Sequence, residues 1–206
     1  MIQFKDINLQ FNNKQVFNDF NLTINEKDKI LLSAPSGSGK TSLVKMLLGI
    51  IRYEGDILLK NQLLTPSTRN FFRKNISYVS QDVDLQNLKT NDLINEILSY
   101  KVNKHISYNQ KLILQLFHQF NLNNEHLEKQ VHDLSGGERA RVGFIIALLL
   151  DRDILILDEI TAGLDEKLKR KIIDYTCHLD KTIIIISHDS LWKEAEKIRL
   201  VEWNNE

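Results

Sequence analysis

The 206-residue sequence predicts an α/β fold: a mainly parallel sheet, an antiparallel β-subdomain before it, and an inserted α-helical subdomain. Three patterns lead to this prediction. The first thirty residues alternate apolar and polar side chains, short apolar runs later alternate with helical segments, and residues 83–131 have mostly helical spacing. The length suits one sizeable domain, which we assign to residues 1–206.

The N-terminal segment has the period of two that is typical of half-buried strands. Its apolar positions predict an antiparallel sheet; they are Ile2, Phe4, Ile7, Leu9, Phe11, Phe20, Leu22 and Ile24. The stretch EGDILLKNQLL (54–64) predicts a return to strand. We identify no internal repeat in the sequence.

Four short apolar runs predict the strands of the parallel sheet, at residues 29–34, 75–82, 153–159 and 181–189. Helices are expected at residues 40–50, directly after Gly137, and between the last two runs, where Leu168, Ile172, Tyr175 and Leu179 share one face. Strands that alternate with helices pair in parallel through right-handed crossovers. The helical segment 83–131, with a break at the Asn-rich 121–126, and the helix after Gly137 together predict a helical subdomain insert at about residues 83–150.

The composition excludes several classes of protein. The formal net charge is zero, so we expect no nucleic-acid partner. The longest apolar run, Val142 to Leu150, is far shorter than the ~20 residues of a membrane span, and the N-terminus carries charges where a signal peptide is apolar. We therefore expect a cytoplasmic protein. Cys177, the only cysteine, excludes an intrachain disulfide and lies on a predicted helix face, which argues against a catalytic thiol.

The segment APSGSGKT (34–41) has the spacing of a phosphate-binding loop between a strand and a helix. In such a loop backbone amides surround phosphates, the lysine reaches the terminal phosphates and the hydroxyl binds Mg²⁺. Glycines let the backbone approach the anion, and the helix start adds a favourable dipole. We predict nucleotide binding here, against the alternative of a Gly/Ser-rich turn before an ordinary helix. The predicted contacts are Ser36, Gly37, Ser38, Gly39, Lys40, Thr41 and Ser42.

The stretch DILILDE (153–159) places Asp158 and Glu159 at the carboxyl end of a buried strand. Ligands bind at that edge in open α/β sheets. One carboxylate can hold the Mg²⁺ shell, and the next can polarise a water for attack on the γ-phosphate. The alternative is a strand that ends in a solvated acidic turn.

Three residues carry weaker signals when each is taken alone. His188 follows an apolar run and is most simply a satisfied polar residue at a strand end. Gln81 would ordinarily be an exposed amide, and Phe11 would ordinarily belong to the core.

Together these segments resemble the nucleotide-binding domain of the ATP-binding cassette (ABC) superfamily. The resemblance covers essentially the whole chain and runs in order through APSGSGKT, SYVSQD, LSGGE, ILILDE, AGLDE and ISHD. It implies a P-loop NTPase core. It also implies that two cassettes pack head to tail with two ATP molecules between them, so that LSGGE (134–138) serves the nucleotide of the partner. Ser135 and Glu138 also have the spacing of a helix capping box, and the two roles are compatible.

The resemblance implies a role for each matching residue. Phe11 would stack on adenine, Thr41, Gln81 and Asp158 would bind Mg²⁺ or its water, and Ser42 matches the second hydroxyl of the loop. Glu159 resembles the catalytic base, and His188 resembles the histidine that contacts the γ-phosphate. Ser135, Gly136, Gly137 and Glu138 would form the signature that acts on the partner's ATP, and Asp165 matches the loop that crosses the dimer interface.

Four positions depart from the family pattern. Ala34 replaces the usual first glycine, and if it needs a positive φ, alanine costs roughly 1–2 kcal/mol. Ile145 and Ile146 replace a common Ala-Arg pair, and Ile160 replaces a frequent proline. None of these removes a group that touches phosphate, so we expect a competent ATPase.

Without a membrane span, the chain cannot transport anything alone. The resemblance therefore implies a cassette subunit that forms a homo- or heterodimer, binds a transmembrane permease subunit and lies on the cytoplasmic face of the membrane. Residues 73–87 are similar to exporter-type cassettes. The alternative is a soluble ABC ATPase that remodels a protein, ribosomal or iron–sulfur assembly.

Overall fold

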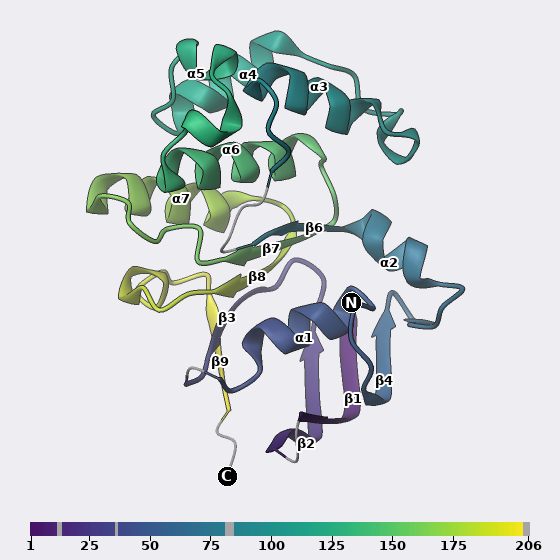
Figure 1. The fold of residues 1–206 in the computed structure, drawn as a ribbon. Coiled ribbons are helices and arrows are strands. Elements are labelled where there is room, and N and C mark those ends of the chain that lie inside the picture. Colours follow the sequence, from purple (N-terminus) through teal and green to yellow (C-terminus); the bar gives the residue numbers. More distant parts are fainter. Residues whose placement is uncertain (12–13, 36, 81–84, 204–206) are drawn as a thin grey trace.

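The computed structural model describes residues 1–11, 14–35, 37–80 and 85–203 (Figure 1). Two sheets form within these ranges: an antiparallel sheet in the order β2-β1-β4-β5 and a parallel sheet in the order β6-β7-β8-β3-β9. The antiparallel strands are β1 (Ile2–Phe11), β2 (Lys14–Ile24), β4 (Glu54–Leu59) and β5 (Gln62–Leu63). The parallel strands are β3 (Lys29–Ser33), β6 (Ile76–Val79), β7 (Ile154–Asp158), β8 (Thr182–Ile186) and β9 (Arg199–Glu202). The predicted division into an antiparallel and a parallel sheet is confirmed.

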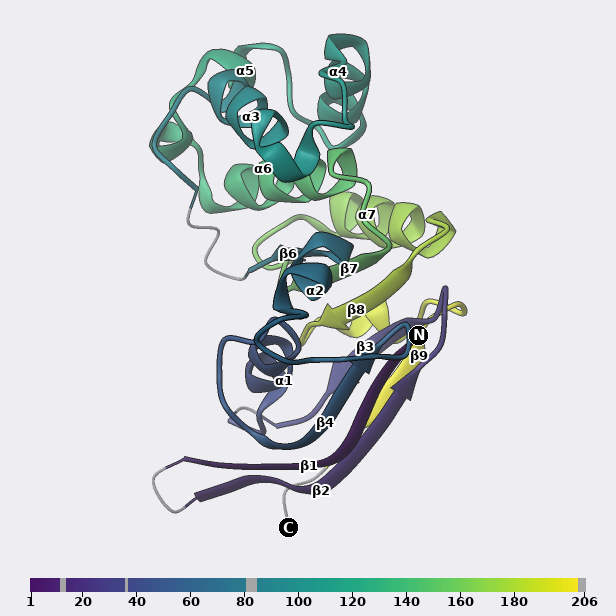
Figure 2. The same cartoon turned by 90° about the vertical axis from the view of Figure 1, so that its right-hand side faces the viewer.

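The parallel sheet is covered on both faces, which explains its continuous apolar runs. Residues Leu155 and Leu157 of β7 join a cluster with α6 (Gly136–Leu149) and α7 (Glu166–His178). Ile154 and Ile156 point the other way, into a cluster with α1 (Lys40–Leu47) and the antiparallel sheet. Figures 1 and 2 show α1 between the two sheets and the helices α6 and α7 on the opposite side of the parallel sheet.

The predicted helical segment contains α3 (Thr90–Ser99), α4 (Gln110–Gln119) and the short α5 (Glu125–Glu128), with 3₁₀ turns at Lys101–Asn103 and Val131–Asp133. The chain breaks at Asn121, whose φ is +55°. These helices lie above α6 in Figure 1 and share its buried cluster. The boundaries of a separate subdomain at about 83–150 stay a prediction. Within the described ranges, no helix combines the length and apolar character that a bilayer crossing requires.

Two elements were not predicted from the sequence. The helix α2 (Arg69–Asn75) is short and buries only Phe72, so it has little periodicity to detect. The edge strand β9 is mostly exposed and therefore lacks an apolar run. Nevertheless, β9 pairs in parallel with β3 along its whole length, from Ile30 opposite Arg199 to Ser33 opposite Glu202.

The expectation of no internal repeat was wrong for the β1–β2 ribbon. Residues 4–9 (FKDINL) and 17–22 (FNDFNL) share the pattern F-x-D-x-N-L. The antiparallel register relates the two copies by an approximate two-fold axis, because Phe4 lies opposite Leu22, Phe17 lies opposite Leu9, and Ile7 lies opposite Phe20.

The repeated Asp and Asn residues lock two matching β-bulges in this ribbon. Asp6 and Asp19 have φ values of +49° and +47°. The backbone N–H of each Asp donates to the side chain of an Asn on the other strand, Asn21 for Asp6 and Asn8 for Asp19, both at 3.1 Å. The same Asn side chains donate back to the Asp carboxylates at 3.0 Å. Bulges bend and twist a ribbon, so these pairs set the direction in which its tip, with Phe11, projects.

Candidate functional site

The phosphate loop connects the carboxyl end of β3 to the start of α1, as the sequence predicts. Gly37 and Gly39 have φ values of +77° and +99°, a region that glycine enters without steric cost. A Cβ on Gly39 would lie 2.5 Å from Val16 Cγ1, so this position also needs glycine for space. Ala34 is not among the positive-φ residues, so its replacement of glycine causes no left-handed strain. Ser36 lies outside the described residues.

Lys40 is the buried cation of this loop. Its side chain folds back, and Nζ donates to the carbonyl oxygens of Ala34 at 2.5 Å and Pro35 at 3.1 Å. Burial lowers the pKa of Lys40, while the nearby charges of Glu159 and Asp158 act in the opposite direction. A desolvated ammonium with acidic neighbours provides the positive charge that phosphate oxygens require.

Asp158 and Glu159 have different environments although they are adjacent. Asp158 ends β7, is 4% exposed, and accepts a hydrogen bond from the Tyr78 hydroxyl at 3.0 Å. Glu159 has a φ of +53°, which is rare for a residue with a side chain. Its backbone N–H donates a hydrogen bond at 2.9 Å to the carbonyl oxygen of Ile186, the last residue of β8. This strained backbone turns the two carboxylates to different positions at one sheet edge.

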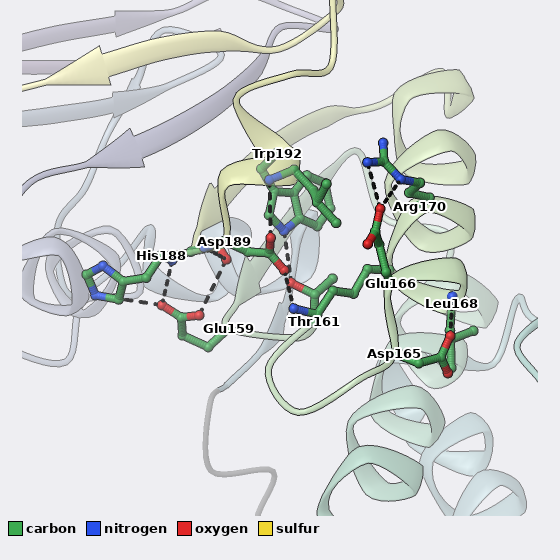
Figure 3. A network of polar contacts seen from close by, with 12 residues as sticks. Glu159, Thr161, Asp165, Glu166, Leu168, Arg170, His188, Asp189 and Trp192 are labelled. Carbon is green, nitrogen blue, oxygen red and sulfur yellow. Dashed lines mark hydrogen bonds and ion pairs between the residues drawn. The ribbon is translucent and has the colours of Figure 1, made fainter.

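The Glu159 carboxylate is oriented by the segment that follows β8 (Figure 3). Its oxygens accept hydrogen bonds from Ser187 Oγ at 3.4 Å and from the His188 backbone N–H at 3.1 Å. The His188 ring nitrogen Nε2 lies 3.9 Å from Glu159 Oε1, and the His188 side chain is 64% exposed. The strand-end histidine is thus beside the acid, as the sequence suggested, and its ring is accessible.

One cavity of about 660 Å³ brings most of the predicted residues together. Its lining contains the predicted residues Phe11, Gly37, Gly39, Lys40, Thr41, Ser42, Asp158, Glu159 and His188. Phe11 is 45% exposed, so the ordinary expectation of a core position does not hold for it. An exposed aromatic ring that lines this cavity suits stacking on a planar group.

The signature segment lies outside this cavity. Ser135 is the N-cap of α6 and forms the predicted capping box: its Oγ accepts from Glu138 N at 3.2 Å, and its N–H donates to Glu138 Oε2 at 2.7 Å. His126 of α5 contacts the other Glu138 oxygen at 2.9 Å. The Ser135 N–H lowers the pKa of Glu138 to about 2, against burial, and His126 adds to this effect.

Asp165 is the N-cap of α7, where its Oδ1 accepts from Leu168 N at 3.0 Å (Figure 3). Gln81 falls outside the described residues. The departures Ile145, Ile146 and Ile160 are all buried, so apolar side chains suit their positions.

Comparison with known proteins identifies the family of this chain. The family model for ABC transporters matches residues 17–162, well over half of the chain. The chain belongs to the ABC transporter family. It therefore contains an ABC ATPase domain.

Individual relatives differ in how much of their length this cassette spans. It is 27% identical to the ergothioneine transport ATP-binding protein EgtV of Helicobacter pylori strain G27, covering 96% of this chain and 93% of that protein. It is 30% identical to the putative ABC transporter ATP-binding protein VPA1482 of Vibrio parahaemolyticus, covering 98% of this chain but only 37% of that protein. Among solved structures, the fold is similar to dimeric MJ0796, a bacterial ABC transporter cassette, with a TM-score of 0.81, 23% identity, and coverage of 98% and 94%.

The donor set of the cassette fits Mg²⁺. The Thr41 hydroxyl and the Asp158 carboxylate line the same cavity, and hydroxyl and carboxylate oxygens are ligands that this hard cation prefers. Within the described ranges, no group of three His, Cys, Asp or Glu side chains forms a metal site. Mg²⁺ usually uses few protein ligands together with substrate phosphates and water, so two donors suffice.

Sequence reasoning missed several residues that support the site. Tyr78 contacts Asp158, Ser187 contacts Glu159, and Val16 lines the cavity. Trp192, which is fully buried, donates from Nε1 to Oγ1 of Thr161, two residues after Glu159, at 3.1 Å (Figure 3). Tyr78 lies within a predicted strand, but nothing in its local pattern indicates which residue its hydroxyl contacts.

Proposed function

We propose that the cassette binds Mg²⁺ and ATP in the 660 Å³ cavity, pairs with a second cassette, and drives a separate transmembrane permease subunit by ATP-dependent closure. One observation carries this proposal: Lys40, Glu159 and His188 line one cavity, while Ser135 is exposed on a helix start outside it. A second chain is therefore needed if Ser135 is to complete the site.

In this proposal Phe11 stacks on the adenine ring. Residues 36–42 bind the phosphates, and Lys40 among them supplies the positive charge. Thr41, Asp158 and Gln81 would hold Mg²⁺, which offsets phosphate charge when bound. Glu159 accepts a proton at its carboxylate from the attacking water, and the Ser187 hydroxyl and His188 N–H hold that carboxylate in place. The His188 ring contacts the γ-phosphate.

The partner chain contributes Ser135, Gly136 and Gly137. The Ser135 hydroxyl already accepts from Glu138 N, but a hydroxyl also has a proton to donate, so it can bind phosphate while it caps α6. Asp165 lies at the interface between the two cassettes in this proposal. ATP drives closure because it binds the closed pair better than the open state.

Replacement of Glu159 by Gln tests the catalytic assignment. The amide keeps the size of the side chain but cannot accept a proton, so we expect turnover to fall roughly 10²- to 10⁴-fold while ATP binding and a closed dimer persist. Glu125→Gln, an exposed acid on α5, is the matched control. Normal hydrolysis by Glu159→Gln would show that another group is the base.

A mixture of Lys40→Ala and Ser135→Arg chains tests the shared site. Each homodimer lacks a functional site, whereas the heterodimer has one intact site, so the mixture should regain activity. If heterodimers form and remain inactive, the shared-site proposal is wrong. Where the native assembly pairs two different cassettes, the experiment uses both.

The nature of the larger assembly requires a separate experiment. The cassette is purified with its native partners from solubilised membranes. A co-purifying polytopic membrane protein supports the permease partnership and a location at the cytoplasmic face of the membrane, and the resemblance of residues 73–87 favours an exporter. Recovery of a soluble protein, ribosomal or iron–sulfur complex instead would favour the remodelling ATPase.

A further inference from the structure

The strand β9 brings a distant part of the chain beside the phosphate loop. It runs parallel to β3 and pairs Glu202 with Ser33, the last residue before that loop begins. Both strands therefore end at the same edge of the sheet, and Trp203 follows at the level of Ala34. Figures 1 and 2 show β9 next to β3 on the side of the β1–β2 ribbon.

Trp203 makes a direct hydrogen bond to the loop. Its indole Nε1–H donates to the carbonyl oxygen of Ser38 at 3.1 Å in a partly buried position. Ser38 lies between Gly37 and Gly39, which both have positive φ. When the amides of a loop converge on an anion, the carbonyl groups between them point elsewhere and need donors of their own.

An aromatic cluster holds the Trp203 ring in place. Its centroid lies 6.0 Å from that of Phe17 and 5.6 Å from that of Phe20. The Phe17 ring in turn packs under the loop, because a Cβ on Gly39 would approach its Cε2 to 2.9 Å. The cluster thus supports the loop at two neighbouring residues, by van der Waals contact at Gly39 and by a hydrogen bond at Ser38.

We propose that Trp203 is a positioning residue of the phosphate loop: its indole N–H holds the Ser38 carbonyl away from the nucleotide and so keeps the neighbouring amides directed at the phosphates. The aromatic rings fix the indole, and the hydrogen bond transmits its position to the loop. This inference rests on the proposed binding of ATP phosphates at residues 36–42.

Two substitutions separate the hydrogen bond from the ring packing. Trp203→Phe keeps an aromatic ring but removes the donor. Phe20→Leu weakens the cluster but keeps the donor. We expect Trp203→Phe to weaken the binding of ATP and of inorganic tripolyphosphate by the same factor, roughly 3- to 10-fold, as for the loss of one neutral hydrogen bond. Because Phe20→Leu keeps both the donor and the Phe17 contact of the indole, it should lower the melting temperature but leave both dissociation constants within about twofold.

The inference is overturned if Trp203→Phe binds both ligands with wild-type affinity. It is also overturned if Phe20→Leu weakens binding as much as Trp203→Phe does. Lys40→Ala separates this failure from failure of the proposed function. If Lys40→Ala still binds ATP and tripolyphosphate normally, the phosphate assignment itself is wrong. If it loses binding and Trp203→Phe does not, only the inference about Trp203 fails.

A measurement on the wild-type chain covers the case in which Trp203→Phe does not fold. The chain has two tryptophans, so its ¹H–¹⁵N spectrum contains two indole N–H signals. Trp192 donates to the buried Thr161, whereas Trp203 donates to the loop. The variant Trp192→Phe identifies the Trp203 signal. We expect tripolyphosphate to shift the Trp203 signal, and if this signal does not shift at saturating tripolyphosphate, the inference is overturned.

Discussion

The starts of α1 and α6 both contain glycine and serine, but their unpaired backbone amides have different surroundings. Every helix begins with backbone amides that lack partners within the helix. At α6 the chain pairs two of them itself, because in the capping box the Glu138 N–H donates to Ser135 Oγ and the Ser135 N–H donates to the Glu138 carboxylate. At α1 the N-cap is Gly39 in the left-handed region, and no side chain among the described residues caps the helix.

This difference indicates what each segment is built to do. The α1 start keeps its amides available and places the buried Lys40 beside them, so it can bind an anion within one chain. The α6 start is already capped, and Ser135 retains only its hydroxyl proton for a further partner. The first segment therefore suits a primary binding site, and the second suits an additional contact from another chain.

The largest expected difference between the two helix starts is in ATP binding, and it should appear when the variants Lys40→Ala and Ser135→Ala are compared. Loss of the buried cation should weaken ATP binding to the dilute monomer roughly 100-fold, as expected for a charge-assisted hydrogen bond. Ser135→Ala should leave that affinity within about twofold but reduce turnover at concentrations where dimers form. Calorimetry and a phosphate-release assay measure the two quantities.

Loss of the Ser135 cap also costs about 1 kcal/mol of stability, so both assays are performed well below the thermal transition. An equal loss of monomer affinity in the two variants would remove the distinction between the loops.

A second test compares Gly39→Ala with Gly136→Ala. At Gly39 the positive φ and the 2.5 Å approach to Val16 should lower the free energy of unfolding by about 1–2 kcal/mol or more. A Cβ on Gly136 meets no atom within 4 Å, and this residue is helical, so alanine should raise that free energy by up to about 1 kcal/mol. Urea unfolding measures the free energy of unfolding of both variants. Equal destabilisation by the two substitutions would show that Gly39 is not under more steric strain than Gly136.

The smallest expected effect concerns Glu138 and pH. Its pKa is about 2 in the folded chain and 4.5 ordinarily, so the folded state is stabilised by the ionised form. This contribution is fully present above about pH 4.5 and is lost as the pH falls toward 2. Glu138→Gln should therefore be less stable than wild type by about 0.5–1 kcal/mol at pH 7, as for a charge near a helix start, with the difference shrinking toward pH 2.5. Denaturant titrations across this range check the sign, and a constant difference would show that the charge is irrelevant.

Short-range patterns in the sequence predicted the local features of this protein. Short apolar runs predicted β3, β7 and β8, because strands buried on both faces need apolar side chains throughout. The spacing of residues 34–41 predicted the loop with Gly37 and Gly39, and Ser135 with Glu138 predicted the cap of α6. Each of these features depends on residues that are close together in the sequence, so a local sequence pattern predicts it.

The tertiary structure decided which distant residues meet. It placed Phe11 at the cavity although its alternation suggested the core, paired the exposed β9 with β3, and brought Trp203 to Ser38 across 165 positions. Tyr78 reached Asp158 across 80 positions in the same way. Such contacts depend on sheet order and on the packing of many side chains together, and neither leaves a periodic signal in the residues that finally touch.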